Sequence, residues 1–249
     1  ACISLPDSLT SFGNSAFSNC TSLTSISLPG NITSISQHAF FKCKNLTTVL
    51  IPGSVTSIES NAFEDCSSLT SVTIPSGLST ISYGAFDGCN RLQSIQFHGS
   101  VTEIGSYAFS HCPLPAVALP PYLKEIKNGA FYHTGLQEIV IPHMVKVIPT
   151  NAFANCRNLR SVTLPASVRS VASRAFYNCS AMTTLVVGSM SDVPWLWIGD
   201  TGTWSDTSSA EWQNAGGSGP AGQVVTFAPG HDGTVTVSQV TPAGIRVTG

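Results

Sequence analysis

Apolar residues recur along this chain at fixed offsets from a proline. In the unit around Pro52 they stand at positions 46, 49, 51, 55, 58, 62 and 63. Proline stands eleven residues before the Phe of each unit, except that His98 takes its place once. The Ala-Phe pairs of the units end, at intervals of 22 or 23 residues, at Phe17, Phe40, Phe63, Phe86, Phe109, Phe131, Phe153 and Phe176. A fixed period of this length predicts a solenoid in which each unit forms one coil.

Each coil is expected to contain one short strand and one tight return. Residues 46–51 are rich in aliphatic side chains and end at Pro52, which indicates a strand. Residues 58–66 are interpreted as a tight turn or a single 3₁₀ turn on the return side. Nine such strands stacked at about 4.8 Å predict a parallel sheet roughly 38 Å long. A coil of this kind buries its apolar row only against its neighbours.

The repeat pattern ends after Val187, where Gly188 replaces the expected proline. We therefore divide the chain into a solenoid (1–187), a Trp-rich cap (188–215), and a Gly-rich linker with a short β tail (216–249). A terminal coil needs a cap because it exposes its interior and a strand edge. An alternative is a sugar-stacking site in the tail. The residues concerned are Trp195, Trp197, Trp204 and Trp212.

The order Leu-x-x-Ile-x-Leu-Pro, then Val-x-x-Ile, then Ala-Phe-x-x-Cys resembles the 23-residue leucine-rich repeats of BspA-like bacterial surface antigens, which are related to treponemal repeat proteins. The resemblance covers residues 1 to about 187. It implies a right-handed leucine-rich-repeat solenoid, mostly β and coil, with the parallel sheet on a concave face and turns or 3₁₀ segments on the return side. It also implies a secreted or surface-anchored protein connected with adhesion and host contact.

Composition excludes some partners. Charged residues make up 10% of the chain, whereas about 25% is typical. The formal net charge is -2, and no Lys/Arg cluster is apparent beyond Lys42 and Lys44, so we expect no nucleic-acid partner and no anionic lipid partner. No apolar run predicts a membrane span. The chain begins without Met inside the repeat pattern, which indicates a trimmed piece of a longer precursor; Ala1-Cys2 as a lipidation scar is an alternative.

Cysteine recurs three residues after most of the Phe positions. Equivalent Cβ atoms in adjacent coils are expected about 4.8 Å apart with parallel Cα–Cβ vectors, which does not suit a disulfide. We therefore expect a buried column of free thiols, although an extracellular location favours disulfides. Cys2 lies outside this column. His111 and His133 occupy equivalent positions and should stack, but two imidazoles make a weak metal site, so neither a metal nor a cofactor is expected.

Polar side chains are expected to face outward along the strands. They form a series of hydroxyl groups that gives way to amides and a few charges. Either Thr simply suits an exposed strand, or the series is a hydrogen-bonding platform for a protein or a glycan. Leu50, Ala116, Ala118, Val140 and Val186 interrupt the polarity and indicate an apolar patch for a protein partner. The candidate binding residues of this face are Thr24, Ser25, Ser27, Thr47, Thr48, Thr70, Ser71, Thr73, Gln93, Gln96, Gln137, Glu138 and Arg160.

Two functions are consistent with these patterns. One is an extracellular adhesion or interaction module that binds a host or matrix macromolecule through the concave face or the tail. The other is a structural unit of a surface layer, fibre or multidomain stalk that associates with its own copies, since an uncovered first strand seeks another edge. Catalysis is not expected. Asp200, Asp206 and Glu211 lie near aromatic residues, but no nucleophile or acid-base pair can be assigned, and no Ser-His-Asp triad is indicated.

Overall fold

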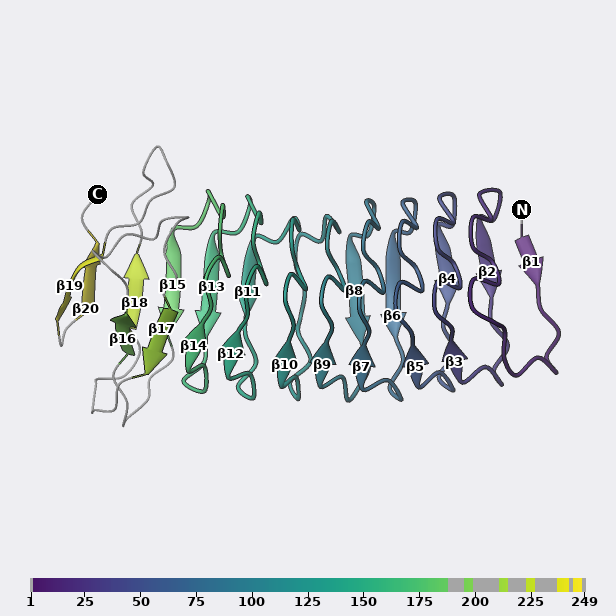
Figure 1. Cartoon of the computed structure of the whole chain (residues 1–249), viewed down its shortest axis with the longest axis horizontal. Helices are drawn as coiled ribbons and strands as arrows, with labels where there is room; N and C mark the ends of the chain where they lie inside the picture. The colour runs from purple at the N-terminus through teal and green to yellow at the C-terminus, as the bar shows by residue number, and fades with distance from the viewer. Residues whose placement is uncertain are drawn as a thin grey trace.

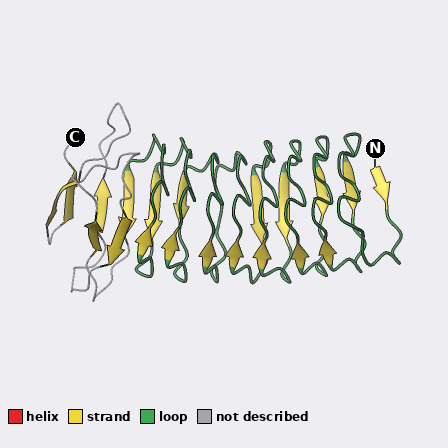
Figure 2. Ribbon diagram, viewed as in Figure 1, coloured by secondary structure: helices red, strands yellow, loops and turns green. Residues whose placement is uncertain are grey.

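The computed structural model describes residues 2–187 and, beyond them, the backbone of residues 195–198, 211–214, 223–226, 237–241 and 244–247. The chain winds through a stack of coils along one axis (Figure 1). The described part consists of strands, turns and loops, and contains no helix (Figure 2). This architecture confirms the repeat solenoid that the periodic pattern predicts.

The predicted strands form the first of two sheets, which we call the major sheet. Each strand pairs in parallel with its counterpart in a neighbouring coil, for example Ile26 with Val49. Equivalent positions of the repeat therefore meet across the coils. The strands are β1 (Cys2–Ser4), β2 (Ser25–Ser27), β4 (Thr48–Leu50), β6 (Ser71–Ile74), β8 (Ser94–Phe97), β11 (Glu138–Val140), β13 (Ser161–Leu164) and β15 (Thr184–Val187).

A second parallel sheet, which we call the minor sheet, lies on the return side, where only turns were expected. Its two-residue strands form because one residue points inward: Ile58, for example, is fully buried and pairs with Ile81 of the next coil. Figure 1 shows these short strands in a row of their own. They are β3 (Ser34–Ile35), β5 (Ser57–Ile58), β7 (Thr80–Ile81), β9 (Glu103–Ile104), β10 (Glu125–Ile126), β12 (Val147–Ile148) and β14 (Ser170–Val171). Strand pairing is continuous from β3 to β10 and again from β12 to β14, with an interruption between β10 and β12.

The return after each minor strand is a series of turns rather than a 3₁₀ helix. Hydrogen bonds alternate in direction: Ala39 N donates to Ser36 O within the coil at 3.1 Å, and Phe40 N donates to Ala62 O of the next coil at 2.8 Å. This alternation requires left-handed backbone at two positions per coil, as at His38 and Lys42, whose φ angles are 55° and 57°. The turns thereby connect coils as a sheet does.

A stack of phenylalanine rings fills the interior. Each ring of the eight Ala-Phe pairs lies on the ring of the next coil, with centroids 5.1 Å apart between Phe40 and Phe63 and 5.6 Å apart between Phe109 and Phe131. All of these rings are buried except that of Phe17 in the first coil, which is half-buried. The stack confirms that the Ala-Phe positions are interior and that the assigned register is correct.

The major sheet is not continuous over nine strands as predicted: strand pairing is interrupted between β4 and β6, and residues 116–119 form no strand. The physical reason for the second interruption is Pro115. In other coils the N–H at this position donates to the preceding coil, as Gln93 N does to Thr70 O at 2.9 Å. Pro115 has no N–H and cannot donate to Gln93. Its carbonyl still accepts from Gln137 N at 3.0 Å, so pairing resumes one coil later.

Further strands pair with the last coil of the solenoid. β17 (Glu211–Asn214) is antiparallel to β14, and β18 (Gln223–Thr226) is antiparallel to β15. β16 (Trp195–Ile198) pairs with β17, which places Trp197 opposite Trp212 in the backbone register. β19 (Val237–Thr241) and β20 (Gly244–Val247) pair with each other. The division at 188–215 and 216–249 stays a prediction.

Candidate interaction surface

The predicted binding residues of the major sheet fall into three columns that run across the coils. All are exposed except Ser25, which is half-buried. The first column comprises the residue before each strand, Thr24, Thr47, Thr70, Gln93, Pro115, Gln137, Arg160 and Thr183. The second comprises Ser25, Thr48, Ser71, Ser94, Ala116, Glu138, Ser161 and Thr184, and the third comprises Ser27, Leu50, Thr73, Gln96, Ala118, Val140, Thr163 and Val186.

Hydroxyl groups of the first column donate hydrogen bonds to the backbone of the preceding coil. Thr47 Oγ1 donates to Thr24 O at 3.0 Å, and Thr70 Oγ1 donates to Thr47 O at 3.4 Å. Thr183 Oγ1 likewise donates to Arg160 O at 3.4 Å. These hydroxyl protons support the backbone between coils, so a ligand cannot use them without breaking those bonds. The second and third columns therefore form the surface that is better suited to a partner.

Large apolar side chains stand in the third column. Leu50 is 68% exposed and Val140 is 63% exposed. Ala116, Ala118 and Pro115 are exposed in the coil before Val140, beside the break in the sheet. These four residues, Pro115, Ala116, Ala118 and Val140, form what we call the apolar island. Val186, the remaining interruption predicted from the sequence, is half-buried.

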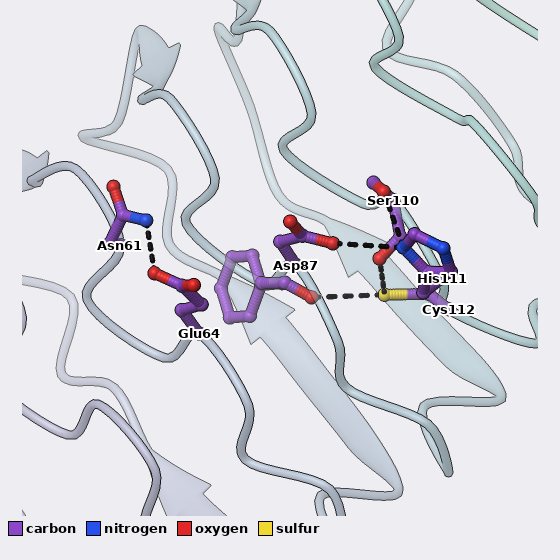
Figure 3. A network of polar contacts seen from close by, with 7 residues as sticks. Asn61, Glu64, Asp87, Ser110, His111 and Cys112 are labelled. Atoms are coloured by element: carbon purple, nitrogen blue, oxygen red, sulfur yellow. Dashed lines mark hydrogen bonds and ion pairs between the residues drawn. The ribbon is translucent and has the colours of Figure 1, made fainter.

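Ser110, His111 and Asp87 lie together on the turn side (Figure 3). Ser110 Oγ and Asp87 Oδ1 are 2.8 Å and 3.3 Å from the same ring nitrogen, His111 Nδ1. A catalytic triad requires the nucleophile and the carboxylate on opposite ring nitrogens. Ser110 is also only 1% exposed, which keeps its hydroxyl from a substrate. This cluster is a surface hydrogen-bond network without the geometry of a triad.

The imidazoles of His111 and His133 stack as predicted, with ring centroids 5.1 Å apart. Partial burial, followed by the nearby charges of His111 and Arg157, lowers the pKa of His133. Within the described ranges, no group of three or more His, Cys, Asp or Glu side chains is arranged to hold a metal ion. We assign the histidine pair no ligand.

The cysteines of the repeat are free thiols that hydrogen-bond along the stack. Cys66 Sγ, for example, donates to Phe40 O at 3.1 Å. Burial raises the pKa of Cys43 to about 11 and raises the pKa of Cys66 well above its ordinary value. Thr134 occupies the cysteine position of one shorter unit, and its Oγ1 lies 3.0 Å from Cys156 Sγ. The side chain of Cys2 lies outside the described residues.

Three cationic residues that are far apart in the sequence occupy the same position of the repeat. Lys124, Lys146 and Arg169 are 22 and 23 residues apart, yet each stands four residues after the proline of its coil. All three are exposed, and each directly precedes a strand of the minor sheet. We call them the basic column. Alignment of the repeats by their proline positions would have revealed it, whereas a search for adjacent Lys and Arg does not.

The predicted tail site lies outside the part whose side chains are described. Trp195, Trp197 and Trp212 belong to the backbone of β16 and β17, and Trp204 falls outside the described residues altogether. Among the residues that the structure does describe, there is no helix with the length and apolar character of a membrane span.

Comparison with known proteins identifies the repeat. The family described as BspA type leucine rich repeat region matches residues 1–115 and 79–193, in six copies. No curated protein matches the chain.

Similar proteins are also found among solved structures. A leucine rich cell surface protein of Faecalibacterium prausnitzii is 30% identical with a TM-score of 0.55, over 74% of this chain and 60% of that protein. The leucine rich repeat protein of T. pallidum is 30% identical with a TM-score of 0.44, over 65% of this chain and 68% of that one. A leucine-rich repeat protein from Bacteroides ovatus is 24% identical with a TM-score of 0.47, over 76% and 63% respectively.

Proposed function

Because the chain belongs to the family of BspA-type leucine-rich repeat proteins, we propose that it is an extracellular interaction module that binds a protein partner through the second and third columns of the major sheet. The similar protein of F. prausnitzii is described as a cell surface protein, which supports this location. The chain spans about three fifths of that protein's length, 60%. The proposal therefore concerns the solenoid and its outward face.

The observation that carries the proposal is the apolar island. Exposed aliphatic side chains on an open sheet lose unfavourable contact with water when a partner covers them. Apart from Glu138, the other residues of the second and third columns are uncharged. Protein interfaces are depleted of charge at their centre, because charged groups are costly to desolvate. Such a surface favours protein binding over catalysis.

The partner class we propose is a macromolecule of the host surface or the extracellular matrix. The test is a binding screen of the purified full chain against immobilised matrix proteins and intact host cells. For any partner found, Val140→Lys should weaken binding about tenfold or more, because a charge is buried at the interface centre. Val147→Lys is the matched control, since Val147 is 47% exposed but lies in β12 of the minor sheet.

Equal loss of binding in the control variant would contradict the proposed face, and so would full binding by Val140→Lys. Self-association, the alternative function, is tested by sedimentation velocity of the same samples. A monomer over the concentration range of the screen supports the interaction module. Assembly that grows with concentration and disappears in Val140→Lys would instead identify another copy of the chain as the partner.

A further inference from the structure

Charge is segregated along the solenoid despite its near-zero net charge. Residues 45–90 contain four acidic residues and no Lys or Arg, namely Glu59, Glu64, Asp65 and Asp87. Residues 139–187 contain five cationic residues and no Asp or Glu, namely Lys146, Arg157, Arg160, Arg169 and Arg174. The segment that forms the last coils therefore carries positive side chains and no negative ones.

The basic column begins one coil earlier, at Lys124, and continues through Lys146 and Arg169 of these last coils. Lys124 N donates to Thr102 O at 2.9 Å, and Arg169 N donates to Lys146 O at 2.7 Å, which ties the column to the hydrogen bonds between coils. Lys146 and Arg169 are thus separated by about one strand spacing, ~4.8 Å at the backbone. Lys124 stands at the same position of the preceding coil, across the interruption of strand pairing between β10 and β12. Lys124, Lys146 and Arg169 present three positive charges in a row.

No ion pair within the described ranges neutralises this row. Glu125 follows Lys124 directly, yet its carboxylate contacts Lys127 instead. Lys127 Nζ also lies 3.9 Å from Glu103 Oε1. Glu103 and Glu125 are therefore both engaged by Lys127, and the three cations of the column repel one another.

The fold has a neutral alternative at this position. Earlier coils carry Thr33, Thr56, Ser79 and Thr102 there. Thr56 Oγ1 donates to Thr33 O, and Thr102 Oγ1 donates to Ser79 O, each at 3.3 Å. Lys124, Lys146 and Arg169 have no hydroxyl to make this hydrogen bond, and their like charges add repulsion.

We propose that the basic column binds a linear acidic polysaccharide, one that carries sulfate or carboxylate groups, with its chain along the solenoid axis. A linear polymer with repeated anionic groups matches a straight row of point charges. Tyr122 is 61% exposed and stands two residues before Lys124 in the same coil, and an exposed aromatic ring of this kind can stack on a sugar. Three cations are fewer than the roughly six to ten phosphate contacts of a strong nucleic-acid site.

This site is separate from the protein-binding face, because the basic column belongs to the minor sheet and the apolar island to the major sheet. The test uses the full chain and two immobilised polymers: heparin, which carries sulfate and carboxylate, and hyaluronan, which carries carboxylate alone. We expect saturable binding to heparin that weakens with salt, and binding to hyaluronan only if carboxylate suffices. Absence of binding to both polymers at low salt would overturn the proposal.

The triple variant Lys124→Thr, Lys146→Thr and Arg169→Thr restores the residue type of the earlier coils. It should keep or raise the melting temperature, weaken binding at least about tenfold, and lower the salt dependence by about three ions. The matched control is Lys44→Thr, Arg91→Thr and Arg157→Thr, three exposed cations at other positions, with the same change in net charge. An equal loss in the control, or equally strong binding of single-stranded DNA by the unaltered chain, would contradict a polysaccharide site in this column.

Discussion

The ring of Phe86 stacks on the ring of Phe63 with their centroids 5.2 Å apart and their planes 3° from parallel. On its other side Phe86 stacks on Phe109 at 5.5 Å. A residue in the middle of the stack therefore packs against two coils at once. Its loss removes contacts on both sides, and the rigid hydrogen bonds between coils limit collapse into the space left behind.

Phe86→Ala should consequently lower the free energy of unfolding by about 3 to 5 kcal/mol. Chemical denaturation followed by circular dichroism measures this loss. Tyr83→Ala, which truncates an aromatic residue that is 53% exposed in the same coil, should have a much smaller effect. If both variants unfold at the same denaturant concentration as the unaltered chain, the stack does not stabilise the solenoid.

Pro115→Thr should repair the break in the major sheet. The new N–H can donate to Gln93 O, as Gln93 N does to Thr70 O. Such a hydrogen bond contributes roughly 0.5 to 1.5 kcal/mol, and loss of the proline constraint on the unfolded chain offsets roughly 0.4 to 1 kcal/mol of it. The melting temperature should thus change little, while hydrogen exchange at residue 115 should be slow. Fast exchange there would show that the hydrogen bond to Gln93 O is not formed. Pro113→Thr is the control for the replacement of a nearby exposed proline by threonine.

The buried thiols predict a loss of stability at high pH. Burial raises the pKa of Cys43 from 9.0 to about 11, so the folded chain keeps a proton that the unfolded chain loses between these values. The stabilising contribution is complete below pH 9.0 and is lost as the pH rises towards about 11. Denaturation midpoints measured at pH 8 and about pH 10.5 should fall less in Cys43→Ala than in the unaltered chain. An equal fall in both would contradict the assignment.

Close approach of two coils makes Gly105 sensitive to substitution. A Cβ atom at this position would lie 2.7 Å from Ile81 O and 2.8 Å from Ser82 C, which are backbone atoms that cannot move independently. Gly105→Ala should therefore destabilise the chain by about 1 to 3 kcal/mol. Gly53→Ala provides the comparison, because a Cβ there meets nothing within 4 Å. Equal stability of the two variants would exclude the close approach.

Repetition explains why the interior could be predicted residue by residue. Each buried position recurs, so the pattern that places Phe63 inside also places Phe86 and Phe109. The minor sheet was missed because a two-residue strand such as Ser57–Ile58 is too short for a periodic signal. The break at residues 116–119 was missed although Pro115 was visible, because the effect of a missing N–H depends on which carbonyl lies opposite.

The surfaces were less predictable than the interior. The outward residues of the major sheet were identified, but the sequence did not show that Thr47 and Thr70 donate their hydroxyl protons to the backbone. Lys124, Lys146 and Arg169 were not recognised as a group, because their proximity arises from the winding of the chain. Candidate ligand-binding residues are those that differ from the residue usual at their position of the repeat. The repeat pattern alone does not predict where such differences occur.

The hydrogen bonds between coils have a consequence for how such a protein can change its length. Ile26 meets Val49 just as Ile139 meets Val162, so one coil presents the same junction to either neighbour. Removal or duplication of one 23-residue unit would leave every remaining junction intact, with stability changing by one step of a nearly additive series. The molecule would thereby become longer or shorter by one coil spacing, about 4.8 Å, without a change in how the other coils fold.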